Sequence, residues 1–95
     1  MTSSLVSYNV VVAGHRTSVR LEPELWDALA AICKRERLTL NDLCTRIDRL
    51  RRASVARALA LKARRGKSAG PVRRPSLTSA MRVHVVVYFR RRARA

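Results

Sequence analysis

The clearest alternation of apolar and polar positions in the chain lies at residues 15–21, HRTSVRL. Three β-branched or apolar side chains fall on one face of an extended strand with this period: Thr17, Val19 and Leu21. The side chains between them fall on the opposite face: Arg16, Ser18 and Arg20. Pro23 cannot continue a strand ladder and suits the first turn of a helix. The pattern therefore predicts a strand over 15–21 with one apolar and one polar face.

Two helical patterns follow this strand. Residues 23–36 carry apolar side chains at helical spacing, with acidic residues near the start and basic residues near the end, as the helix dipole favours. Residues 40–52 carry the most regular apolar stripe of the chain: Leu40, Leu43, Cys44, Ile47 and Leu50. Thr39 is a typical N-cap for this second helix. We expect helices over 23–36 and 40–52, joined by a turn at Arg37 or a neighbour, which would carry some strain if it is left-handed.

The remaining segments give weaker signals. Residues 1–14 contain the β-prone run LVSYNVVVA, which is either an additional strand with a turn at Ala13-Gly14 or an extended arm. Residues 53–75 form a basic, Ala/Arg-rich extension that ends in a linker; its first part, 53–65, either lengthens the second helix or forms a separate one. Residues 76–95 form a C-terminal helix and basic tail, because a helical stripe and the possible N-cap Ser76 outweigh the β-branched run near residue 85.

Composition narrows the class of protein. The 95 residues carry a formal net charge of +15, and the sequence pI is about 11.8. Nucleic acid is the natural partner of such a chain. A basic membrane-surface peptide is disfavoured because the acidic residues and the tryptophan lie in a folded-looking middle. No signal peptide or membrane span is expected, and the two cysteines lack zinc-ligand spacing. We therefore expect a cytoplasmic, nucleoid-associated protein with no metal or cofactor.

A strand followed by two short helices resembles the ribbon-helix-helix proteins, and more closely a bacterial family with this domain. Four segments carry most of the resemblance: GHRTSV at 14–19, LEP at 21–23, LTLNDL at 38–43 and LTSAMRV at 77–83. The resemblance implies a mostly α-helical fold with one short strand and an additional C-terminal helix. It also implies an intertwined homodimer, in which each chain donates its strand to an intermolecular antiparallel ribbon that enters the DNA major groove. Arg37 stands where the family usually has glycine.

The resemblance also implies roles for individual residues. Three polar residues of the strand would contact bases: Arg16, Ser18 and Arg20. Independently of the resemblance, the free backbone N–H groups and the dipole at the start of the second helix suit a phosphate near Thr39, Leu40 and Asn41, and an ordinary capped helix is the equal alternative. Arg64 and Arg65 would contact phosphates through their charge. Further arginines would add phosphate affinity: Arg73, Arg74 and Arg90–Arg92. The dimer core would be formed by Val19, Leu21, Trp26, Leu29, Ile32, Leu43 and Ile47.

We expect a non-enzymatic protein, because no catalytic triad, carboxylate pair or glycine-rich phosphate loop is discernible. The predicted function is sequence-specific binding of double-stranded DNA by a dimeric transcriptional repressor. The sequence does not decide whether dimers assemble further on DNA. One alternative is an antitoxin whose segment after residue 50 folds on a protein toxin. The other is a non-specific nucleoid- or RNA-binding protein that uses its arginine-rich tail. For the strand itself, the competing interpretation is an ordinary solvated face.

Overall fold

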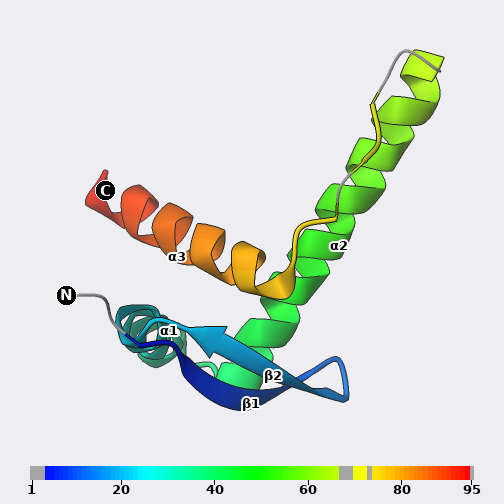
Figure 1. Cartoon of the computed structure of the whole chain (residues 1–95). Helices are drawn as coiled ribbons and strands as arrows, with labels where there is room; N and C mark the ends of the chain where they lie inside the picture. The colour runs from blue at the N-terminus through cyan, green and yellow to red at the C-terminus, as the bar shows by residue number, and fades with distance from the viewer. Residues whose placement is uncertain (1–3, 67–69, 73, 95) are drawn as a thin grey trace.

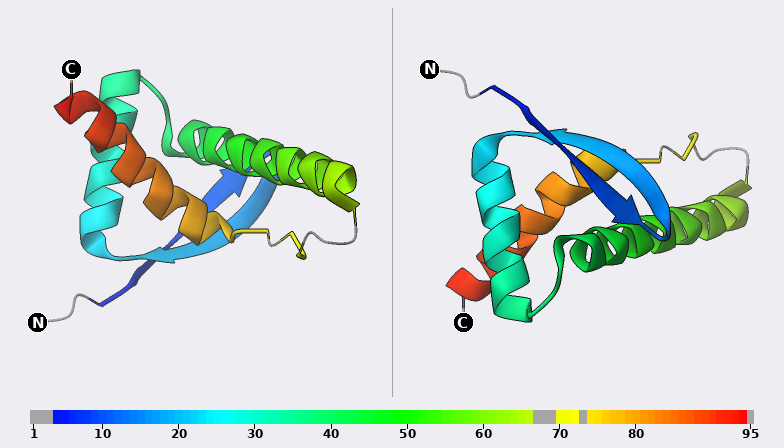
Figure 2. Two further views of the ribbon diagram at one scale, coloured as in Figure 1. Left: turned by 90° about the horizontal axis from the view of Figure 1, so that it is seen from above. Right: turned by 90° about the horizontal axis from the view of Figure 1, so that it is seen from below.

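A computed structural model describes residues 4–66, 70–72 and 74–94. In this part, two strands precede three helices: β1 (Val6–Val12), β2 (His15–Leu21), α1 (Pro23–Glu36), α2 (Leu40–Arg65) and α3 (Leu77–Ala93). The strands form a hairpin, and α1, α3 and the first part of α2 lie on one side of it (Figure 1). The helices enclose a triangle when the molecule is viewed from above, and the hairpin crosses beneath them (Figure 2). The other side of the hairpin therefore carries no helix.

The predicted strand at 15–21 pairs within its own chain along one of its two edges. β2 pairs antiparallel with β1 of the same chain, with Val12 opposite His15 at the turn and Val6 opposite Leu21 at the open end. The segment LVSYNVVVA, for which the sequence allows either a strand or an extended arm, therefore contains a strand. Ala13 and Gly14 form the two-residue turn with φ of 50° and 84°. Two consecutive positive φ angles match the right-handed twist of a hairpin, which is why β1 can fold back directly onto β2.

The helices begin at the residues that the sequence indicates. Pro23 opens α1, and Arg37 closes it in the left-handed conformation, with φ 56° and ψ 46°. The Thr39 side chain caps α2 by accepting a hydrogen bond from the backbone N–H of Asp42 at 3.1 Å. Ser76 caps α3 in the same way, accepting from Ser79 at 3.1 Å. The prediction of a C-terminal helix is confirmed.

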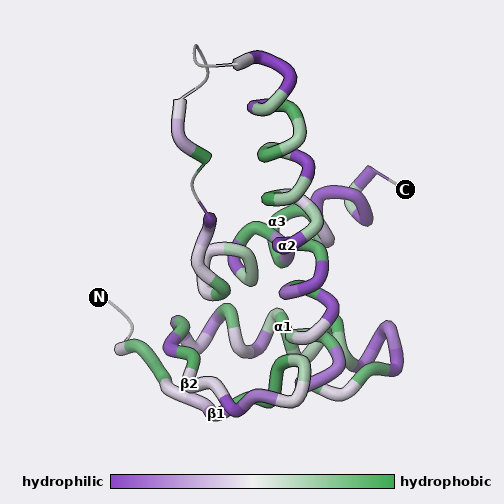
Figure 3. Tube along the Cα trace, turned by 90° about the vertical axis from the view of Figure 1, so that its right-hand side faces the viewer, coloured by the Kyte–Doolittle hydropathy of each residue, from purple (hydrophilic) through white to green (hydrophobic). Residues whose placement is uncertain are grey.

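The second helix is longer than the predicted 40–52. It continues to Arg65, so the segment 53–65 lengthens α2 and does not form a separate element. No glycine or proline interrupts the alanine-rich stretch before Gly66, and the high helix propensity of its residues carries the helix onward. The last turns of α2 extend well beyond the hairpin and the other helices (Figure 1). Polar and apolar residues alternate along this projecting part (Figure 3).

The hydrophobic core is built within the single chain. All seven residues predicted for a dimer core are buried in it: Val19, Leu21, Trp26, Leu29, Ile32, Leu43 and Ile47. β1 supplies Val10 and Val12, and α3 supplies Met81 and Val85. The residues predicted for a dimer core thus pack within one chain, because β1 and α3 cover surfaces that a strand and two helices alone would leave exposed.

Candidate nucleic-acid interface

The side of the hairpin that faces away from the helices carries the three residues predicted to contact bases. Arg16, Ser18 and Arg20 are all exposed on it. The strand register places Val11 opposite Arg16, Asn9 opposite Ser18, and Ser7 opposite Arg20. We call these six residues the outer face of the hairpin. The sequence analysis missed the contribution of Ser7 and Asn9, although the alternation of polar and apolar residues in β1 was the signal that could have found it.

The outer face is positively charged and carries no acidic residue. All six acidic residues of the chain lie between positions 22 and 48, in the helices and at the start of α1. Neither Arg16 nor Arg20 has an ion pair in the part of the chain that the structure describes. Ser18 Oγ lies 2.9 Å from Ser7 Oγ, so the two hydroxyls form a hydrogen bond across the strands. The two arginines therefore keep their guanidinium donors available for a ligand.

The chemistry of this face suits the edges of base pairs. A guanidinium can donate two hydrogen bonds to O6 and N7 of guanine, and a hydroxyl can donate or accept. Arg16 and Arg20 are four residues apart on one strand, which separates their Cα atoms by about 13 Å at the usual rise per residue. The core side of both strands is anchored by buried valines and Leu21, so the face is held on a packed support.

The start of α2 lies against the edge of β1, next to the outer face. Asn41 Oδ1 accepts a hydrogen bond from the backbone N–H of Val11 at 2.9 Å, and Thr45 Oγ1 accepts from Ala13 at 3.2 Å. The side chains of Thr39 and Asn41 are thus engaged within the protein. The backbone N–H groups of Leu40 and Asn41 have no hydrogen bond among the described residues, as expected for the first turn of a helix. Because the side chains of Thr39 and Asn41 are already hydrogen-bonded, the predicted phosphate site rests on these two backbone N–H groups and on the helix dipole.

The two edges of the hairpin differ in their surroundings. The turn makes Val12 and His15 a hydrogen-bonded pair, and such pairs alternate along an antiparallel ladder. The backbone groups of Arg16, Ser18 and Arg20 consequently point away from β1, toward the free edge of β2. The edge of β1 is covered by the side chains from α2, whereas no backbone hydrogen bond covers the edge of β2 in the described part. β2 therefore offers an open strand edge beside its basic side chains.

The basic residues at the far end of α2 are not brought to the hairpin. Arg64 and Arg65 lie at the end of the projecting helix, remote from the outer face (Figure 1). Arg90–Arg92 lie in the last turns of α3, on the helical side of the molecule. Arg73 lies outside the described residues. The basic side chains are thus spread over several surfaces, and the outer face is one of them.

Trp26 is a core residue and does not stack against a ligand. Its indole Nε1 donates to the carbonyl oxygen of Val6 at 2.9 Å, and its ring meets the Tyr8 ring edge-on at 4.9 Å. The side chain is buried. A buried tryptophan that satisfies its polar atom in this way fastens the first residue of β1 to α1.

Three acidic residues hold the helices in place. Asp48 is nearly buried and binds Arg51 and Arg52 within α2; the second contact is 2.8 Å. Glu22 binds Arg82 of α3 at 2.9 Å, and Glu36 accepts from the Tyr88 hydroxyl at 2.9 Å. The hydrogen bonds from Arg51, Arg82 and Tyr88 are the main reasons that the pKa values of Asp48, Glu22 and Glu36, respectively, are lowered. These three carboxylates therefore stabilise the folded chain.

The comparison with protein families agrees with this geometry. A family model described as "Ribbon-helix-helix domain" matches residues 5–63, and the chain belongs to this family. Ribbon-helix-helix domains generally bind DNA and dimerise, their fold is not an enzymatic one, and their members are typically transcription regulators or antitoxins. No curated protein and no solved structure matches the chain. Within the described residues, no helix is long and apolar enough to cross a membrane.

Proposed function

We propose that this protein binds specific sites on double-stranded DNA as a homodimer and acts as a transcriptional repressor. The observation that carries the proposal is the outer face of the hairpin, where Arg16, Ser18 and Arg20 are exposed side by side on a strand. A two-stranded ribbon fits the major groove, where each base pair presents a distinct pattern of donors and acceptors. Each bidentate contact from an arginine to guanine would contribute about 1–3 kcal/mol of discrimination.

The open edge of β2 supports a homodimer in which β2 pairs with its copy. Antiparallel pairing about a two-fold axis at Ser18 places Arg16 of one chain opposite Arg20 of the other, on the same side of the sheet. The result is a four-stranded sheet with four arginines and two serines along its central pair of strands. Such a dimer would read a two-fold symmetric site. It keeps the predicted pairing between copies and adds β1 as an outer strand.

This pairing would make dimerisation depend on DNA. Like charges directly opposite one another across a strand pair are destabilising, and the free dimer would place two such arginine pairs side by side. Guanine acceptors and phosphates would relieve this repulsion in the complex. The free N–H groups of Leu40 and Asn41 lie beside the sheet, where they are suited to hold a flanking phosphate. Arg64 and Arg65 would add phosphate affinity outside the central site.

Selection of bound duplexes from a randomised pool tests the proposal. The wild-type chain is compared at about 0.15 M salt with the Arg16→Ala/Ser18→Ala/Arg20→Ala variant. The control is Arg57→Ala/Arg90→Ala, which removes the same charge from exposed helical positions that lie outside the hairpin. We expect enrichment of a symmetric site by the wild type and the control, and its loss in the hairpin variant.

Either of two results would overturn this function. Enrichment that survives in the hairpin variant would show that the outer face is not the reader. Binding without any sequence preference, lost in the control variant as much as in the hairpin variant, would instead favour the non-specific nucleoid- or RNA-binding alternative. The antitoxin alternative requires a protein partner, and co-purification with a toxin encoded nearby is its test.

A further inference from the structure

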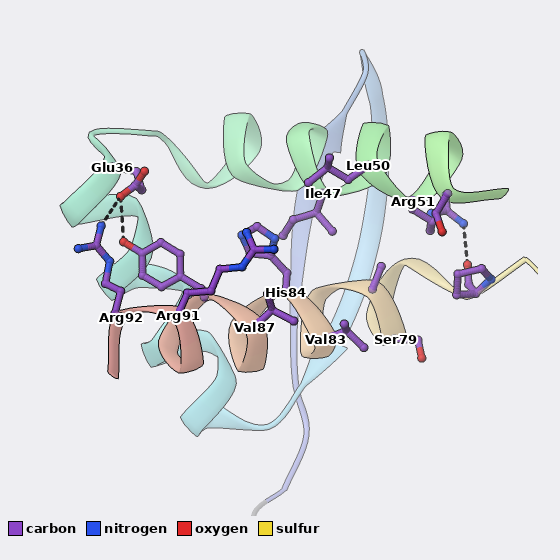
Figure 4. A pocket seen from close by; sticks show the side chains of 14 residues that line it. Glu36, Ile47, Leu50, Arg51, Ser79, Val83, His84, Val87, Arg91 and Arg92 are labelled. Carbon is purple, nitrogen blue, oxygen red and sulfur yellow. Dashed lines mark hydrogen bonds and ion pairs between the residues drawn. The ribbon is translucent and has the colours of Figure 1, made fainter. Parts of the chain in front are cut away.

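A groove between α2 and α3 is a surface feature that the proposed DNA contacts leave unexplained. It encloses about 730 Å³, and apolar side chains from both helices line it, among them Ile47, Leu50, Val83 and Val87. Figure 4 shows these side chains converging from the two helices. Leu50 is 56% exposed and Val83 is 61% exposed, which is unusual for large side chains that face one another across a groove. Such a surface indicates an occupant.

Interactions at both ends keep the groove open. At one end, Arg51 donates to the carbonyl oxygen of Pro75 at 3.0 Å, which ties α2 to the start of α3. At the other end, Glu36 accepts hydrogen bonds from Tyr88 at 2.9 Å and from Arg92 at 3.0 Å, which ties α1 to the end of α3. The separation of α2 and α3 is thus fixed before anything binds. A preformed groove lowers the entropic cost of binding.

The charge around the groove indicates what kind of occupant fits. Arg51, Arg91 and Arg92 line it, and the single acidic residue in its wall, Glu36, is already engaged. Arg91 has no hydrogen bond or ion pair among the described residues, and its side chain extends from α3 over the groove (Figure 4). An apolar floor with a free guanidinium at its rim is complementary to a surface that combines apolar side chains with carboxylates.

A second copy of the chain is a poor match for this rim. Each copy carries a net charge of +15, and three of its six acidic residues already pair with arginines of their own chain. Bringing another copy into the groove would add like charges beside Arg91 and Arg92. The occupant that the charges favour is therefore a different, acidic chain.

We propose that the groove between α2 and α3 binds an acidic amphipathic helix of another protein. Apolar side chains spaced one helical turn apart would enter between Leu50 and Val83, and carboxylates along one flank would meet Arg91. No residue of the hairpin lines the groove, and α2 and α3 diverge on the side of the molecule away from the hairpin (Figure 1). The partner and DNA can thus be bound at the same time, and the proposal does not depend on the DNA-binding function.

A designed peptide tests this site directly. The probe is a fluorescent peptide of about 16 residues with leucines along one helical face and glutamates along both flanks. Its binding to the full chain is followed by fluorescence anisotropy at about 0.15 M salt. A scrambled peptide of the same composition measures attraction due to charge alone. We expect the amphipathic peptide to bind at least about tenfold more tightly than the scrambled one.

Variants locate the binding on the groove. Leu50→Asp should abolish the difference between the two peptides, and Arg91→Gln should weaken the amphipathic peptide about fivefold. Val86→Asp is the matched control, because Val86 is a 53% exposed residue of α3 that does not line the groove. It should leave binding unchanged. Circular dichroism and the selected DNA site are recorded for each variant, so that loss of folding and loss of DNA binding are seen separately.

Three outcomes would overturn the proposal. Equal affinity for the scrambled and the amphipathic peptide would mean that net charge alone causes the binding. Equal affinity of the Leu50→Asp and Val86→Asp variants for the amphipathic peptide would place the peptide elsewhere. Dissociation of a wild-type dimer by Leu50→Asp, and not by Val86→Asp, in sedimentation would make a second copy the occupant.

Discussion

The side-chain Oδ1 of Asn41 accepts a hydrogen bond from the backbone N–H of Val11 at 2.9 Å. This contact joins two residues 30 positions apart and places the start of α2 against the outer edge of β1. It satisfies a strand donor that would otherwise face solvent, and it makes that edge unavailable to another strand. Among the described residues, β2 is then the strand that keeps an open edge, and the sheet can grow in that direction.

We predict that Asn41→Ala lowers the free energy of unfolding by about 0.5–1.5 kcal/mol, the usual contribution of one hydrogen bond. Urea unfolding followed by circular dichroism measures the change. Asn9→Ala is the matched control, because Asn9 is an exposed strand amide whose side chain has no hydrogen bond among the described residues. If the two variants are equally stable, the contact with Val11 does not hold α2 against the hairpin.

Proline at Ser18 should separate folding from dimerisation. The Ser18 N–H points toward the open edge, so Ser18→Pro leaves the hairpin ladder intact while it removes a donor that pairing between two β2 strands requires. We expect a folded chain that stays monomeric in sedimentation equilibrium, alone and with its DNA site. Asn9→Pro removes the corresponding outward donor of β1 and should dimerise like the wild type. A dimeric Ser18→Pro variant would contradict pairing through this edge.

Loss of the Asp48 carboxylate should destabilise α2 where it meets the core. Its side chain is only 5% exposed and binds both Arg51 and Arg52, and Arg51 is itself 13% exposed. Asp48→Ala leaves the poorly solvated Arg51 guanidinium without its carboxylate, which we expect to cost about 1–3 kcal/mol. Asp42→Ala, at an exposed position of the same helix, is the comparison. Equal urea midpoints for the two variants would contradict a structural role for Asp48.

Acid should weaken the fold through the same carboxylates. The pKa values of Asp48, Glu22 and Glu36 are lowered from their ordinary values of 3.8, 4.5 and 4.5, chiefly by hydrogen bonds from Arg51, Arg82 and Tyr88. The unfolded chain therefore takes up protons before the folded chain does. Their contribution to stability is complete above about pH 5 and is lost as the pH falls through the lowered pKa values. Urea midpoints measured at intervals of about one pH unit, from about pH 6 to about pH 3, follow this loss. Asp48→Asn should flatten the profile, and an unchanged profile would contradict the assignment.

A second pH effect should arise at His84. Burial is the main cause that lowers its pKa from 6.5, and the positive charge of Arg46 on α2 adds to it. His84 also stacks on Tyr88 at 6.4 Å and lies in the wall of the groove. Because the unfolded chain binds this proton more readily, stability should fall as the pH drops below about 6.5. His84→Gln should reduce the fall, whereas substitution of the exposed His15 should not. Identical profiles for wild type and His84→Gln would contradict the prediction.

Local structure was largely predictable from the residues themselves. The alternation of apolar and polar residues defines strand β2, Pro23 marks the start of α1, and Thr39 marks the start of α2. These signals act within a few residues, through side-chain spacing, proline geometry and capping hydrogen bonds. The end of α2 was not predictable in the same way, because helix propensity weakens gradually and Gly66 is the first residue that stops it.

The residues alone specify a basic chain with one polar strand face and two amphipathic helices, and they place Arg16, Ser18 and Arg20 together on that face. The three-dimensional fold settles which strand β2 pairs with, because a strand edge can be satisfied by any strand of suitable register, and β1 lies nearest along the chain. It also decided that Asn41 closes one edge, and that α2 and α3 leave a groove between them. These relationships join residues far apart in sequence, and no local pattern encodes them.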